Sequence, residues 1–208
     1  LIDMDEGLRC LDIMLDAERE IVFDLADALE SGEEDKAIYK IARYENVFLV
    51  PAPNKTGSIT PENLSLFAEK LSRKFDILIF DFPAGIDIPL YSALPEKTVF
   101  FTVAVPDAIS IRDASSVNMA LSSSGMTTRL IINKFDIKKM RKGIYHNIDD
   151  MIDLSGIRLI GIVPESKELA FFSLKHKLKM RGNTAKAFLR IANRAQGNRV
   201  ALPKFKKI

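Results

Sequence analysis

Short apolar runs alternate with longer amphipathic stretches along this chain of 208 residues. The apolar runs are rich in Ile, Val and Phe and have the length of buried strands. They predict strands at 1–5, 47–51, 76–81, 98–104, 128–133 and 157–163. The amphipathic stretches predict helices at 8–15, 21–31, 60–74, 108–124, 147–154 and 184–196. Strands that alternate with helices predict right-handed βαβ crossovers, and therefore an α/β fold: a doubly wound three-layer sandwich with a mostly parallel sheet.

The predicted helix 60–74 has the clearest start signal in its sequence. Thr60 is a preferred N-cap residue, Pro61 suits the first helical position, and Glu62 falls in the first turn. Four apolar residues then recur at helical spacing and predict the buried face: Leu64, Phe67, Ala68 and Leu71.

The composition is that of a globular protein with a substantial core, because 47% of the residues are hydrophobic and 28% are charged. We expect one domain over 1–198 and a basic tail over 199–208. The net charge of +2 argues neither for nor against nucleic acid. The single cysteine, Cys10, excludes an internal disulfide and fits a reducing cytosol. No apolar run approaches the roughly 20 residues that span a bilayer.

Acidic residues stand where two predicted strands end. Asp3 and Asp5 are two positions apart, so their side chains point to the same side of an extended chain. Asp81 ends another apolar run, and Gly85 follows it in a loop. Carboxylates at this edge of a parallel sheet predict a metal–phosphate site, since Mg²⁺ prefers oxygen ligands. The alternatives are acidic helix caps at Asp3 and Asp5, and a plain strand-to-turn transition at Asp81.

Two further strand ends carry groups that suit a nucleotide base. Asn133 offers both a donor and an acceptor to a purine edge, and Lys134 can lay its alkyl stem across a ring. Pro164 and Glu165 close the next apolar run. Proline there leaves neighbouring backbone free to contact a base. A turn at 133–136 and a simple helix start at Pro164 remain the alternatives.

The segment 52–59 is polar and predicts a surface loop. It contains Lys55-Thr56-Gly57, but it lacks the paired glycines whose spacing lets backbone N–H groups surround a phosphate. We therefore do not expect a phosphate loop there, and no other segment of the sequence supplies one.

Taken in order, these motifs resemble the MinD/ParA family of P-loop ATPases, and its MinD branch in particular. Residues 3–12 read Asp-Met-Asp-Glu-Gly-Leu-Arg-Cys-Leu-Asp, where the family has Asp-x-Asp and then Gly-Leu-Arg-Asn-Leu-Asp. Residues 81–86 read Asp-Phe-Pro-Ala-Gly-Ile, where the family has Asp-Ser-Pro-Ala-Gly-Ile. Residues 110–114 and the strand ends at 130–133 and 161–165 also match family motifs. The resemblance covers nearly the whole chain in the right order.

The resemblance implies a Mg²⁺-dependent ATPase. Asp5 would orient or activate the attacking water, and Asp3 and Asp81 would hold Mg²⁺, partly through waters. Gly85 would lie near the γ-phosphate. The resemblance places the remaining nucleotide contacts at the base: Asn133, Lys134, Pro164 and Glu165.

The resemblance also implies a cell-division regulator in which ATP drives dimerisation and hydrolysis acts as a timer. The expected partners are a second copy of the chain, a protein of the division-inhibitor or activator type, and the cytoplasmic face of the membrane. Nucleic acid is not an expected partner. The dimer and partner surface would include Arg9, Asp12, Arg112 and Asp113.

The sequence departs from the family in two places. The family's phosphate loop should precede Leu1, so we expect this chain alone to expose unpaired strand edges and to be inactive as an ATPase. The segment 204–208 is basic with two apolar residues, which is too short for more than marginal membrane binding. The alternative functions are a non-enzymatic scaffold with a degenerate ATPase fold and a ParA-type DNA-partition ATPase.

Overall fold

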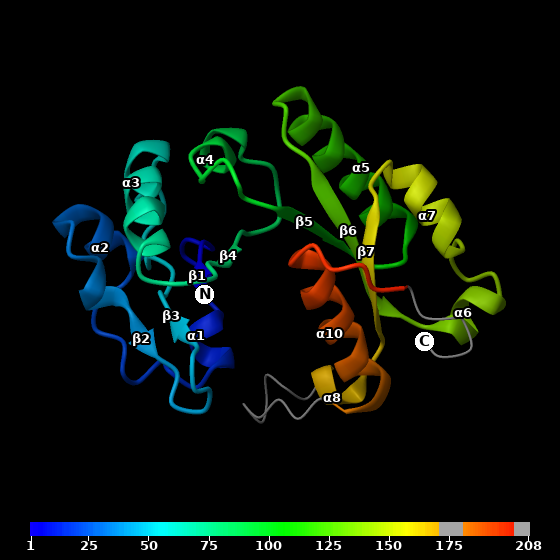
Figure 1. The fold of residues 1–208 in the computed structure, drawn as a ribbon, viewed down its shortest axis with the longest axis horizontal. Coiled ribbons are helices and arrows are strands. Elements are labelled where there is room, and N and C mark those ends of the chain that lie inside the picture. The colour runs from blue at the N-terminus through cyan, green and yellow to red at the C-terminus, as the bar shows by residue number, and fades with distance from the viewer. Residues whose placement is uncertain (171–180, 202–208) are drawn as a thin grey trace. The chain divides into compact units, whose positions relative to one another are not determined.

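The computed structural model describes residues 1–170 and 181–201 (Figure 1). The chain forms two compact units. The N-terminal unit is Leu1–Thr98, and the C-terminal unit comprises the described residues from Val99 onward. The tail expected over 199–208 lies outside the described residues from 202 on. The assignment of 1–198 to a single domain therefore stays a prediction.

Strand β1 (Ile2–Asp3) is paired on both sides in the N-terminal unit. It runs parallel to β4 (Phe80–Asp81), and Ile2 also makes a parallel bridge to Val50. The unit's other sheet is antiparallel and pairs β2 (Tyr39–Lys40) with β3 (Phe48–Leu49). Because β1 has neighbours on both sides, both of its residues, Ile2 and Asp3, are buried.

The helices of the N-terminal unit are α1 (Leu11–Met14), α2 (Leu25–Ser31), α3 (Pro61–Ser72) and α4 (Ile88–Ser92), with the 3-10 helix η1 (Glu34–Ala37) after α2. The predicted start of α3 is confirmed. Thr60 accepts the backbone N–H of Asn63, the Asn63 side chain accepts the N–H of Thr60, and Pro61 occupies the first turn. Its predicted buried face is confirmed as well, because Leu64, Phe67, Ala68 and Leu71 are all buried.

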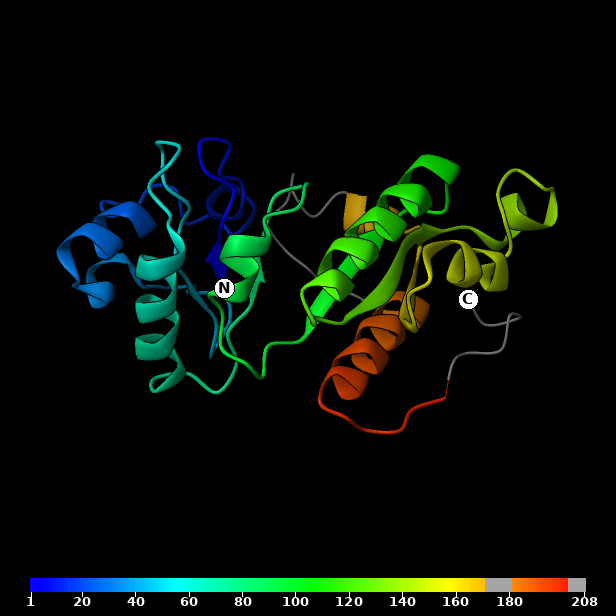
Figure 2. The same ribbon diagram turned by 90° about the horizontal axis from the view of Figure 1, so that it is seen from above.

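The C-terminal unit is a parallel sheet between helices. Its strands β5 (Phe100–Ala104), β6 (Thr128–Phe135) and β7 (Leu159–Pro164) lie in that order. Helices α5 (Ala108–Ser123) and α7 (Ile148–Ser155) share one core cluster with the strands, whose buried members are Ala104, Ile111, Ala114, Leu130, Ile132, Phe135, Ile148, Met151, Ile157 and Ile162. Helix α10 (Gly182–Ala195) packs on β7 from the other face (Figure 2). Two short helices, α6 (Ile137–Arg141) and α8 (Lys167–Ala170), follow β6 and β7.

Every strand and helix expected from the sequence overlaps a described element, and the α/β class is confirmed. The patterns missed η1, α4, α6 and α8, which have only four or five residues each, and the strand β2. Elements this short do not complete the repeating apolar pattern by which helices and strands are recognised.

Strands β4 and β5 each pair with a described strand on one side only. Apolar side chains near these strands are exposed: Ile77 and Ile79 before β4, Val99 before β5, and Phe101 and Val103 in β5. A strand edge of this kind is a place where a sheet can accept another strand, and the edges expected from a missing phosphate-loop strand stay a prediction.

Gly161→Ala is expected to destabilise the C-terminal unit. A Cβ at this position would stand 2.2 Å from Cγ1 and 2.7 Å from Cδ1 of Ile191 on α10, so the helix approaches β7 too closely for any side chain. We expect the free energy of unfolding to fall by about 1–3 kcal/mol, as measured by urea denaturation. The double variant with Ile191→Ala should lose less than the sum of the two single losses. Additive losses would contradict a clash with Ile191.

Candidate functional site

The Asp3 carboxylate organises the loop that follows β1. It is only 1% exposed, and it accepts three backbone N–H groups. Oδ1 accepts from Asp5 (3.1 Å), while Oδ2 accepts from Cys10 (3.3 Å) and Leu11 (3.2 Å). The buried charge is therefore compensated, and it ties the loop 4–10 to the start of α1.

Asp81 joins Asp3 at the carboxyl edge of the sheet, because the two residues are register partners in β1 and β4. The Asp81 carboxylate has no hydrogen-bond or ion-pair partner among the described residues. Burial, followed by the charges of Asp3 and Asp5, raises the pKa of Asp81. The three carboxylates expected at this edge are thus brought together in the N-terminal unit.

The Cys10 thiol lies near the same carboxylates. Burial, followed by the charges of Asp3 and Asp81, raises the pKa of Cys10. A thiol with a raised pKa is a poor nucleophile, because the thiolate is the reactive form. This position, where the family motif has Asn, therefore adds no nucleophile to the edge.

The donor set at this edge suits a loosely held hard cation. Among residues 1–170 and 181–201, no three His, Cys, Asp or Glu side chains are arranged to enclose a metal ion. Mg²⁺ is commonly held by one or two carboxylates, with waters and substrate phosphates as its other ligands. Asp81, with its unpartnered carboxylate, fits such a ligand, and the bonds of Asp3 to backbone suit contact through water.

Glu6 anchors the loop 52–59 and was not singled out from the sequence. Its carboxylate accepts the backbone N–H groups of Gly57 (2.9 Å), Ser58 (2.8 Å) and Ile59 (3.1 Å). Successive backbone N–H groups often bind an anion, and those of this loop do so. The anion they bind is the carboxylate of Glu6 in the same chain. No local signal could have revealed this contact, because it joins residues more than 50 positions apart.

Arg9 and Asp12 form an ion pair next to this loop. Nη2 and Nε of Arg9 donate to Oδ2 of Asp12 at 2.7 and 2.9 Å, and Nη1 donates to Oδ1 of Asn54 at 3.0 Å. Asp12 is only 4% exposed, so contact with a partner here would have to be made mainly by Arg9. The assignment of Arg9 and Asp12 to a dimer or partner surface stays a prediction.

Gly85 lies on an exposed loop after β4 and has a φ of +131°, which an L side chain rarely adopts. The hydroxyl of Tyr91 donates to the Gly85 carbonyl at 3.3 Å, and the Tyr91 ring contacts the edge of Phe82 at a centroid distance of 4.9 Å. These contacts connect the exposed loop to α4.

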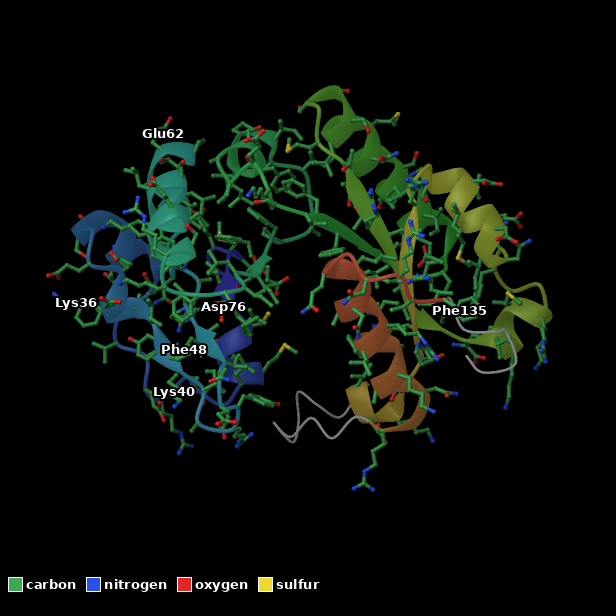
Figure 3. The ribbon with its side chains drawn as sticks, in the orientation of Figure 1. Lys36, Lys40, Phe48, Glu62, Asp76 and Phe135 are labelled. Atoms are coloured by element: carbon green, nitrogen blue, oxygen red, sulfur yellow. The ribbon has the colours of Figure 1, made fainter. Side chains whose placement is uncertain are left out.

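The residues expected to contact a base lie together in the C-terminal unit. Pro164 is the register partner of Phe135, and the Glu165 N–H donates to the Phe135 carbonyl at 2.9 Å. Phe135, labelled in Figure 3, is buried beneath this edge and packs against Tyr145. Asn133 lies within β6, which runs on to Phe135 and so extends past the strand end expected at 133, and Glu165 follows β7. The two residues are therefore near the same edge of the sheet.

The side chains of Asn133 and Glu165 each have a hydrogen-bond partner within the C-terminal unit. Oδ1 of Asn133 accepts the N–H of Lys134 at 2.9 Å, which leaves the Asn133 amide nitrogen without a described partner. Lys134 has a φ of +54°, which turns the chain sharply after Asn133. Glu165 pairs with Lys139 at 2.8 Å, and this bond raises the pKa of Lys139. Lys139 was missed by sequence reasoning, since it lies 26 positions away from Glu165.

Arg112 and Asp113 lie on the exposed surface of α5 and pair with each other at 3.1 Å. An exposed pair of this kind contributes little to stability, so both side chains remain available to a partner. Their role in a dimer or partner surface stays a prediction.

The comparisons with known proteins agree with these motifs. The chain is 31% identical over 208 residues to the septum site-determining protein MinD of Synechocystis. The alignment covers 95% of this chain and 77% of that protein. The chain belongs to the MinD/ParA family. No family model matches it.

Solved structures support the family and its fold. The MinD of a MinC:MinD cell division protein complex from Aquifex aeolicus superposes with a TM-score of 0.86 at 28% identity, covering 98% of this chain and 84% of that one. A septum site-determining MinD from Pyrococcus horikoshii, complexed with Mg-ADP, superposes at 0.77 with 23% identity, covering 93% and 81%. The chain therefore has a P-loop NTPase-like α/β fold, as expected from the sequence.

Asp81→Asn is expected to raise the free energy of unfolding at about pH 7. A raised pKa in the folded state means that folding disfavours the ionised carboxylate relative to the unfolded chain, whose Asp pKa is about 3.9. Ionised Asp81 therefore costs stability. The gain from Asn should be present near neutrality and should fade as the pH falls through the raised folded pKa to about pH 3.

Urea denaturation at both pH values would measure the effect of Asp81→Asn. Asp76→Asn is the matched control, because Asp76, labelled in Figure 3, precedes the same strand but lies outside the group of Asp3, Asp5 and Asp81. An equal gain from Asp76→Asn, or a loss from Asp81→Asn at neutral pH, would show that the carboxylates at the sheet edge do not repel one another.

Glu6→Gln is expected to loosen the loop 52–59. A neutral amide accepts fewer and weaker hydrogen bonds than a carboxylate, so the N–H groups of Gly57, Ser58 and Ile59 should exchange with deuterium about tenfold faster. Hydrogen exchange read by NMR or mass spectrometry would show this. Glu20→Gln, at an exposed site, should leave the rates unchanged. Unaltered exchange in Glu6→Gln would mean that Glu6 does not hold the loop.

Proposed function

We propose that this chain is part of an ATP-dependent spatial regulator of the MinD type, which acts in cell-division site placement. One observation carries the proposal: Asp3 and Asp81 are paired at the carboxyl edge of a parallel sheet, with Asp5 beside them. Its support comes from 31% identity to a septum site-determining protein over most of both chains. A neighbour solved with Mg-ADP supports the same class of ligand.

The carboxylate edge would serve phosphate chemistry. Asp81, and Asp3 through water, would hold Mg²⁺, which when bound neutralises phosphate charge. Asp5 is free to orient a water, because its backbone N–H is fixed by Asp3 while its carboxylate has no described partner. Gly85 would place backbone N–H groups near the terminal phosphate.

The base would be read in the C-terminal unit. The amide nitrogen of Asn133 is available to donate to an adenine ring nitrogen, and the backbone near Pro164 would line the ring. Glu165 and Lys139 would hold the strand end in place. Lys134 would cover the ring with its alkyl stem.

The regulatory cycle would use partners. A solved MinC:MinD complex supports a protein partner of the division-inhibitor type. ATP-dependent pairing of two copies, with Arg9, Arg112 and Asp113 at the contact surface, belongs to the same proposal. Within 1–170 and 181–201 every helix is too short or too polar to span a bilayer. We propose a cytoplasmic protein whose membrane contact is peripheral.

Asp5→Ala is expected to abolish ATP turnover while nucleotide binding persists. Loss of the group that orients water should lower the hydrolysis rate by about a hundredfold or more, because general-base catalysis contributes that much. Hydrolysis would be measured as phosphate release in the presence of Mg²⁺. Nucleotide binding would be measured by equilibrium titration with a fluorescent ATP analogue, and both assays would use the full-length protein. Asp76→Ala is the control, and it should leave both unchanged.

The same assays separate the alternatives. Loss of nucleotide binding in Asp5→Ala would show that Asp5 has a different role. If the wild-type protein neither bound nor hydrolysed ATP, an interaction scaffold would replace the proposal. ATP-dependent sedimentation with anionic liposomes is expected; salt-sensitive DNA binding instead would favour a partition ATPase.

A further inference from the structure

Three arginines gather at the amino edge of the C-terminal sheet. Arg129, Arg158 and Arg194 line a pocket of about 250 Å³, together with Leu159, Ile160 and Asn198. Arg129 is the second residue of β6, and Arg158 immediately precedes β7. The pocket is therefore at the opposite end of these strands from Asn133 and Glu165.

Backbone pairing holds two of these arginines at neighbouring positions. Leu130 and Leu159 are register partners, and the Leu130 N–H donates to the Arg158 carbonyl at 2.9 Å. Arg129 and Arg158 precede this pair in adjacent parallel strands, so their side chains point to the same face of the sheet at its amino end. The sheet itself thus places two positive charges side by side.

Main-chain carbonyls orient the arginine side chains. Arg194 donates from Nη1 to the Ile160 carbonyl and from Nε to the Val200 carbonyl, both at 2.7 Å. Its Nη2 has no described acceptor. Nη1 of Arg129 donates to the Thr128 carbonyl at 3.0 Å. These guanidinium groups are therefore positioned before any ligand binds, which lowers the entropy lost on binding.

No carboxylate neutralises this cluster among the described residues. Arg129, Arg158 and Arg194 form no ion pair there, whereas Arg9, Arg112 and Lys139 each have an acidic partner. Like charges around a small pocket repel one another, and a bound anion would relieve the repulsion. The planar fork of guanidinium donors matches the oxygens of both carboxylate and phosphate groups, and a cluster of three arginines favours the more highly charged phosphate.

We propose that this pocket binds a phosphate group, either of a small soluble phosphate or of an anionic phospholipid headgroup. The arginines would contact the phosphate oxygens, and the Asn198 amide would add a donor at the rim. Leu159 and Ile160 would contact the apolar part of an ester. The site is separate from the carboxylate edge and from the base-contacting strand ends, so it does not rest on the proposed function.

Arg158→Gln is the primary test variant, because the Arg158 side chain is exposed and has no described partner. Inorganic phosphate would be titrated into the chain by NMR, with chloride adjusted to keep the ionic strength constant. We expect saturable shifts at Arg158 and Asn198 in the wild type and at least about tenfold weaker binding in Arg158→Gln. Arg141→Gln, an exposed arginine on α6, is the charge-matched control and should bind normally.

A second arm identifies the source of the phosphate. Flotation with phosphatidylglycerol vesicles, compared with phosphatidylcholine vesicles, would be run on the same variants without nucleotide. The proposal is supported if, in either experiment, Arg158→Gln weakens binding and Arg141→Gln leaves it unchanged. The experiment that gives this result shows whether the ligand is a soluble phosphate or a phospholipid headgroup. Absence of binding in both arms, or equal losses in the two variants, would overturn it. If Arg158→Gln fails to fold by circular dichroism, Arg129→Gln takes its place.

Discussion

The N-terminal unit depends on the buried carboxylate of Asp3. A charge that is 1% exposed would be costly without partners, and three backbone N–H groups compensate it. Those bonds close the loop 4–10 around the carboxylate and start α1 at its far end. Asp5 is positioned by the first of them. The backbone positions of Asp5, Cys10 and Leu11 thus follow from a single desolvated side chain.

Most element positions could be predicted because their signals are local. The start of α3 is written in Thr60 and Pro61, and its buried face follows from apolar spacing. The strand ends that carry Asp81 and Asn133 were legible for the same reason, since an apolar run that stops at a polar residue needs no distant information. That Asp3 and Asp81 meet was anticipated from the pattern too, because parallel strands end at a common edge. Their individual roles came only from the resemblance.

The contacts that sequence reasoning missed are long-range or depend on burial. Glu6 meets the amides of 57–59 across more than 50 residues, and Lys139 meets Glu165 across 26. Arg129 and Arg158 become neighbours only through the pairing of β6 with β7. Asp12 looked like a surface residue, yet its ion pair with Arg9 allows it to be buried. Pattern alone carries no information on such pairings.

The hydrogen bonds of Glu6 also connect the loop after β1 to the start of helix α3. Glu6 adjoins Asp5 in the chain, grips Ser58, and the Ser58 carbonyl accepts the side-chain amide of Asn63 in the first turn of α3 at 2.9 Å. The loop that carries Asp5 and the start of α3 are therefore joined by two successive hydrogen bonds, and neither segment can be rearranged without breaking one of them.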